Sequence, residues 1–206
     1  MTPGLDTAHD VAALQRLGVK LFLDPACTLD LEVAIRVFHR FIRTGAADGL
    51  LVDVTDYRHV HEGPGVLLIA HEGTYSLDLS EGRLGLQYMR KQPLAGDLVA
   101  RLVAACRIAL HACRQLELAP ELDGPVRFQA DELLVLSNDR LRAPSTEAAA
   151  EALQRPVADV WARLHGAATG EVSRRGTPAE RLQLVARASS DPGVSALLSR
   201  LSNGTF

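Results

Sequence analysis

The chain lacks most of the features that would identify a function directly. Aromatic residues make up only 4% of its 206 residues, and its three cysteines, Cys27, Cys106 and Cys113, form no CxxC pair. An odd number of widely spaced cysteines argues against a disulfide framework and for reduced thiols. No apolar run reaches the roughly 18 residues of a membrane span, and the N-terminal segment is too polar for a secretory signal. We therefore expect a cytoplasmic protein with no membrane partner.

The chain also lacks a strong excess of positive or negative charge. The chain has 22 basic and 25 acidic residues, for a formal net charge of −3. Because this charge is small and mixed, it does not indicate nucleic acid as a partner. Only two basic residues are lysines, Lys20 and Lys91, and alanine is abundant, a composition typical of GC-rich bacterial genomes.

Two segments have the pattern of long amphipathic helices. The segment 28–44 can be capped by Thr28 or Asp30 and carries apolar residues at every third or fourth position. The segment 96–118 can be capped by Asp97 and carries a similar apolar stripe. We expect both helices to pack against a sheet.

Short apolar runs between glycines and prolines predict about six or seven strands. These runs lie at 19–23, 50–54, 66–70, 75–79, 84–89, 126–128 and 133–136. The run 66–70 does not alternate between apolar and polar residues, which predicts a central strand covered on both faces. Because strands and helices do not alternate regularly, we predict an α+β fold with a mainly antiparallel sheet.

The C-terminal part of the chain predicts further helices. Pro156 is placed to open a helix, and the residues 177–180 match a capping box with proline at the first helical position. The segment 167–176 has no apolar periodicity and is typical of a linker. We therefore predict a core domain over 1–166, followed over 167–206 by a linker and a short helical extension.

Reactive side chains are densest near the middle of the chain. Three of the seven histidines, His59, His61 and His71, lie within thirteen residues, together with Asp56 and Glu62. His-x-His on a strand places both imidazoles on one face. With a three-residue hairpin loop after Glu62, His71 shares that face, whereas with a two-residue loop it points to the other face.

This segment supports three interpretations. In the first, His59, His61, His71 and Glu62 bind a divalent transition metal as cofactor. In the second, His59 and His71 exchange protons at neutral pH without a metal, and Asp56 orients them. In the third, the histidines are ordinary exposed residues of a strand and a turn. Whether the protein is an enzyme stays open.

Two other groups are candidates for chemistry. Cys27 precedes a predicted helix, whose positive N-terminal end would favour a reactive thiolate; the alternative is a small, partly buried side chain. His111 shares a stripe of the second helix with Arg107 and Arg114, which could hold an anion or face solvent.

Two classes of function follow from these patterns. The first is a small cytoplasmic, bacterial-type enzyme or ligand-binding protein whose site lies in the segment 56–78 and takes a small molecule. The second is a non-catalytic interaction protein, in which the sheet edge or the C-terminal helices join copies of the chain in a homo-oligomer.

Overall fold

The computed structural model describes residues 10–61, 63–166 and 170–203. The strands are β1 (Leu17–Phe22), β2 (Leu51–Tyr57), β3 (Gly65–Ala70), β4 (Gly73–Asp78), β5 (Gly85–Arg90), β6 (Glu132–Ser137), β7 (Glu171–Arg175) and β8 (Gln183–Arg187). The α-helices are α1 (Leu31–Thr44), α2 (Leu98–Glu117), α3 (Glu147–His165) and α4 (Val194–Asn203), and short 3-10 turns lie at η1 (Val11–Ala13) and η2 (Ser80–Gly82). Within these ranges no helix is both long and apolar enough to cross a membrane.

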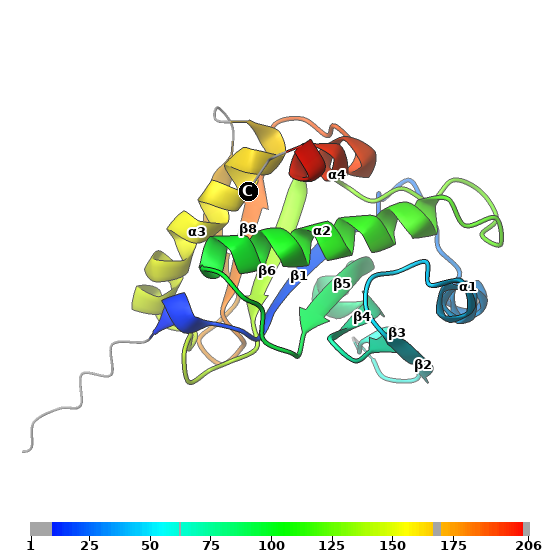
Figure 1. Cartoon of the computed structure of the whole chain (residues 1–206), viewed down its shortest axis with the longest axis horizontal. Coiled ribbons are helices and arrows are strands. Elements are labelled where there is room, and N and C mark those ends of the chain that lie inside the picture. The colour runs from blue at the N-terminus through cyan, green and yellow to red at the C-terminus, as the bar shows by residue number, and fades with distance from the viewer. Residues whose placement is uncertain (1–9, 62, 167–169, 204–206) are drawn as a thin grey trace, which may run out of the picture.

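The described strands form one sheet in the order β2-β3-β4-β5-β1-β6-β8-β7, and every neighbouring pair is antiparallel. The α+β class with a mainly antiparallel sheet is thus confirmed, with eight strands in the described ranges rather than six or seven. The strands change direction across the sheet, which is strongly twisted (Figure 1).

The helices form a layer against the sheet. The helix α2 crosses in front of the central strands β1 and β5 (Figure 1), while α1 packs on β2 and β3 and α3 packs on β7 and β8. The helix α4 lies against α2 and α3. The predicted helices 28–44 and 96–118 correspond to α1 and α2, which begin at Leu31 and Leu98 because Asp30 accepts hydrogen bonds from the Glu32 and Val33 amides and Asp97 accepts one from the Ala100 amide. The prediction of two long helices is incomplete, because α3, with 19 residues, is longer than α1.

Both faces of β1 are buried. Leu17, Val19 and Leu21 join the core under the helices, whereas Phe22 on the other face joins a smaller cluster composed of strand residues only. On that second face the ammonium of Lys20 lies 2.7 Å from an Asp78 carboxylate oxygen, and both side chains are buried. The sheet therefore has a second, partly polar core.

The predicted central position of 66–70 is wrong. The strand β3 lies second from the edge of the sheet, and the side chains of Leu67 and Ile69 are only partly buried. Val66, Leu68 and Ala70 join the core under the helices, so that this strand is buried on one face and only partly covered on the other.

The predicted linker and helix within 167–206 are wrong for residues 171–187, which form β7 and β8 and extend the same sheet. The Glu180 carboxylate does accept a 2.6 Å hydrogen bond from the Thr177 amide, as in a capping box, but this bond closes the turn between the two strands. The helix in the described part of this segment is α4.

Two smaller predictions also differ from the structure. Pro156 lies inside α3 rather than at the start of a new helix, and the packing of Leu153, Val157 and Val160 in the core spans that position. The predicted strand 126–128 is reduced to one isolated bridge, between Leu23 and Phe128.

Candidate functional site

The hairpin between β2 and β3 is longer than the sequence suggests. Tyr57 pairs with Gly65, so that the described residues between them, 58–61 and 63–64, belong to the turn. Backbone bonds from the Val60 amide to the Tyr57 oxygen and from the Gly63 amide to the Val60 oxygen fold this turn. The predicted two- or three-residue loop is therefore wrong, and strand alternation no longer applies to the histidines within the turn.

The three histidines of the predicted site lie at two ends of the hairpin. His59 and His61 are exposed in the turn, whereas His71 follows β3 at its other end, where its amide donates to the Leu50 oxygen. Six residues of strand separate these ends by about 20 Å. Glu62 lies outside the described residues, and among the rest of the described chain no three His, Cys, Asp or Glu side chains are grouped to hold a metal.

Asp56 does not orient a histidine as predicted. It opposes Val66 on β3, and its carboxylate accepts hydrogen bonds from the Arg58 guanidinium, the shortest at 2.8 Å. These hydrogen bonds lower the pKa of Asp56 below its usual range. The His59 ring stacks on the Tyr57 ring with centroids 6.1 Å apart. The predicted acid/base group of His59, His71 and Asp56 is therefore not assembled in this structure.

The cysteines are all buried. Cys27, the predicted reactive thiol, is 8% exposed in the core, and the residue that caps α1 is Asp30, further along the chain. Burial raises the pKa of Cys106 to about 12 and raises the pKa of Cys113 as well. Little thiolate is thus expected at these two positions on α2 near neutral pH.

The predicted stripe of His111 and Arg107 is partly neutralised by an acid from another segment. The Asp48 carboxylate, which follows α1, lies 2.7 Å from His111 Nδ1 and 3.5 Å from an Arg107 guanidinium nitrogen. The Gln115 amide contacts the other ring nitrogen of His111 at 3.2 Å. Arg114, the third residue of the predicted stripe, lies 3.8 Å from a Glu117 carboxylate oxygen. Because all three groups are paired, the stripe offers little free positive charge to an anion.

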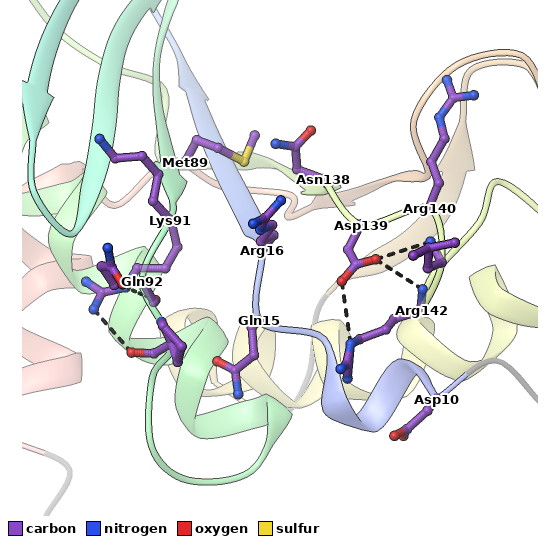
Figure 2. Close-up of a pocket in the computed structure, with 13 residues that line it drawn as sticks. Asp10, Gln15, Arg16, Met89, Lys91, Gln92, Asn138, Asp139, Arg140 and Arg142 are labelled. Atoms are coloured by element: carbon purple, nitrogen blue, oxygen red, sulfur yellow. Dashed lines mark hydrogen bonds and ion pairs between the residues drawn. The ribbon is translucent and has the colours of Figure 1, made fainter.

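A broad groove of about 1340 Å³ lies at one end of the sheet (Figure 2). Its lining comes from the segment before β1, the end of β5 and the loop after β6. The lining residues are Asp10, Gln15, Arg16, Met89, Arg90, Lys91, Gln92, Pro93, Asn138, Asp139, Arg140, Leu141 and Arg142.

The groove lies where the central strand β1 begins, beside the ends of its two neighbours: Leu17 pairs with Ser137 of β6, and Gly18 pairs with Met89 of β5. Arg101, buried on α2, donates hydrogen bonds to the backbone oxygens of Ala12 and Leu14, which hold the chain before Leu17 on the helix side of the sheet. The segments that follow β5 and β6 continue past the start of β1, one on each side of it. The space left between them is the groove (Figure 2).

The lining of the groove is strongly basic. Among the residues that the structure describes, it contains five basic ones, Arg16, Arg90, Lys91, Arg140 and Arg142, and two acidic ones, for a net charge of +3. The whole chain carries −3, so the groove is opposite in sign to the protein. A concave surface of one sign concentrates the electric field and attracts the opposite charge.

Two of the arginines are held in place by backbone oxygens. Arg90 Nε donates to the Gln92 oxygen at 2.7 Å, and Arg140 Nη2 donates to the Ala179 oxygen, in the turn between β7 and β8, at 2.7 Å. Carbonyl oxygens orient a guanidinium without cancelling its charge. Both cations are therefore positioned before a ligand arrives.

The other three cations differ in how much charge they leave available. Arg142 lies 3.5 Å from the Asp139 carboxylate, which neutralises part of its charge. Arg16 and Lys91 are exposed, and their side chains make no hydrogen bond or ion pair within the described ranges. These two are the cations most available to a ligand.

No local sequence pattern indicates this groove, because its cations come from three distant segments. The only local signals are the short basic segments 90–91 and 140–142, which resemble ordinary solvated surface.

Comparison of the chain with protein-family models, curated proteins and solved structures finds no match.

Proposed function

We propose that the protein binds an anionic ligand in the groove and acts through binding rather than catalysis. The observation that carries this proposal is the net charge of +3 in the lining, in a chain whose own net charge is −3. This retains the ligand-binding class expected from the sequence but moves its site from 56–78 to the groove.

The arrangement of the cations supports an anion of several charges. Lys91 comes from one wall, Arg140 and Arg142 come from the other, and Arg16 lies between them (Figure 2). Guanidinium groups bind phosphate and carboxylate oxygens in pairs, with short, charge-assisted hydrogen bonds. A ligand that bridges the walls would contact charges contributed by all three segments.

The lining chemistry supports binding over catalysis. Within the part of the chain that the structure describes, the lining includes no His, Cys, Ser, Thr or Tyr. These are the side chains that most often act as nucleophiles or exchange protons near neutral pH. Among the described lining residues, the side chains that could act as nucleophiles are Lys91, Asp10 and Asp139. Lys91 is exposed, without the burial that activates a catalytic amine, and Asp139 is paired with Arg142.

Calorimetry with inorganic tripolyphosphate tests this proposal. We expect binding that weakens as salt rises from about 50 to 300 mM, because salt screens exposed charges. The variant Arg16→Glu with Lys91→Glu should bind at least about tenfold more weakly, since two attractive charges become repulsive.

The matched control is Arg36→Glu with Arg155→Glu, which changes the net charge equally at exposed positions on α1 and α3. We expect its affinity to stay within about twofold of wild type, because a Debye length of about 8 to 10 Å screens distant charges. Equal losses in the two variants would show that tripolyphosphate senses only overall charge, and the proposal would fail.

The exposed apolar residues of the sheet edge favour a second candidate function, self-association. The strand β2 is an edge strand, and Leu50, Val52, Tyr57 and Val60 in and beside it are all at least 40% exposed. Two copies could pair through this edge, since antiparallel pairing of identical strands is symmetric. Sedimentation of wild type and Val52→Lys tests this: a dimer that the variant loses supports it, and a wild-type monomer refutes it.

A further inference from the structure

One apolar side chain stands out on the rim of the groove. Leu141 is 91% exposed, the highest value among the exposed large apolar side chains of the described ranges. It lies between Arg140 and Arg142, and all three line the groove. Met89, which is partly buried, contributes an apolar surface to the opposite wall (Figure 2). The groove therefore combines positive charge with apolar surface on both walls.

We propose that the anionic ligand is an acidic polypeptide segment with an apolar side chain of about leucine size, which contacts Leu141. This inference rests on the proposed function, because it names the class of ligand for the same groove. Acidic side chains on either side of the apolar residue would meet Arg140 and Arg142, and further acidic residues would meet Arg16 and Lys91. The rim has an apolar residue between two basic ones, and the proposed partner has an apolar residue between two acidic ones.

The size of the groove supports a polypeptide over a small anion. Sites for small molecules usually enclose about 300 to 1,000 Å³, whereas this groove holds about 1340 Å³. Its cations are also spread over both walls rather than gathered around one point (Figure 2). A single phosphate would contact one or two of them, whereas an extended chain can contact all.

Other polyanions fit the groove less well. A bilayer surface is flat and cannot follow a groove in which Arg90 is only partly exposed. Single-stranded nucleic acid is usually bound by aromatic side chains that stack on its bases, and none of the described residues that line the groove is aromatic. Neither ligand would place an apolar side chain in the groove against Leu141 or Met89, whereas an acidic peptide with a leucine would.

Fluorescence anisotropy with two labelled peptides tests the inference. One peptide of about ten residues has a central leucine among Asp and Glu residues, and the other has serine in place of that leucine. We expect the leucine peptide to bind wild type about tenfold more tightly, from the apolar area buried against Leu141. In Leu141→Ser this ratio should fall to about one. In the control Leu118→Ser, at an exposed leucine outside the groove lining, it should stay unchanged.

The remaining outcomes separate the inference from the proposed function. If both peptides bind equally to wild type and both are lost in Arg16→Glu with Lys91→Glu, the inference is overturned and anion binding stands. If neither peptide nor tripolyphosphate binds, both are overturned. Tighter binding of phosphatidylserine vesicles or of a single-stranded oligonucleotide than of the leucine peptide would also overturn the inference. Because Leu141 is almost fully exposed, its substitution should leave the fold intact, which circular dichroism can check.

Discussion

Replacing Arg101 with methionine tests how the groove is built. The Arg101 side chain is 4% exposed and donates to the backbone oxygens of Leu14 at 2.5 Å, Ala12 at 2.5 Å and Asp97 at 3.1 Å. Methionine keeps much of the apolar stem but removes all three hydrogen bonds. The chain before β1 would then lose its main link to α2.

The expected loss of stability follows from these three bonds. One bond is buried and two are partly buried, and hydrogen bonds from a charged group contribute about 1.5 to 3 kcal/mol when buried and less when exposed. We expect Arg101→Met to lower the free energy of unfolding by about 3 kcal/mol. For a chain of this size that corresponds to a fall in Tm of about 6 to 12 °C.

Urea unfolding and hydrogen exchange measure the effect. The amides of 11–16 should exchange faster in Arg101→Met even under native conditions, because the segment opens locally. The control is Arg107→Met on the same helix, where an exposed ion pair of 3.5 Å is lost and the cost should be under about 1 kcal/mol. A loss in Arg101→Met no larger than in the control, or unchanged exchange of 11–16, would refute the proposed origin of the groove.

Three further predictions concern buried polar groups. Lys20→Met should lower the free energy of unfolding by about 3 to 5 kcal/mol in urea titrations, because it leaves the buried Asp78 without its cation; a loss below about 1 kcal/mol would contradict this. Burial raises the pKa of Glu117 above its ordinary 4.5, so the folded state binds more protons than the unfolded state and loses stability as pH rises from 4.5 through the raised value. Glu117→Gln should therefore be more stable than wild type at pH 7, and its advantage should disappear near pH 3; a constant difference would argue against the raised pKa. In native protein, iodoacetamide should modify Cys27 and the other two cysteines only slowly at pH 8, and all three quickly in urea, as measured by mass spectrometry; rapid native labelling of Cys27 would restore it as a reactive thiol.

The sequence predicts α1 and α2 well because their signals are local. In α1 and α2 the capping aspartates, Asp30 and Asp97, and the apolar stripe all act within the helix itself. The pair Thr177 and Glu180 shows the limit of such signals. The same side-chain bond closes a strand turn here, because the pairing of β8 with β6 and β7 decides the structure.

The candidate site was harder to predict for the same reason. The histidines near His59 are close in sequence but lie at both ends of a hairpin whose register no local signal fixes. In contrast, Arg16, Lys91 and Arg140 are far apart in sequence and meet because β1 lies between β5 and β6. A sequence pattern finds residues that are neighbours along the chain, whereas this groove is made by the order of strands in the sheet.

The most direct test of the groove as an anion site is an amide chemical-shift titration with tripolyphosphate by nuclear magnetic resonance. We expect saturable shifts concentrated at residue 16 and in the segments 89–92 and 138–142, with little change along the stripe of Arg107 and His111 on α2. Shifts spread evenly over exposed basic residues, or centred on that stripe, would contradict the assignment of the groove as the binding site.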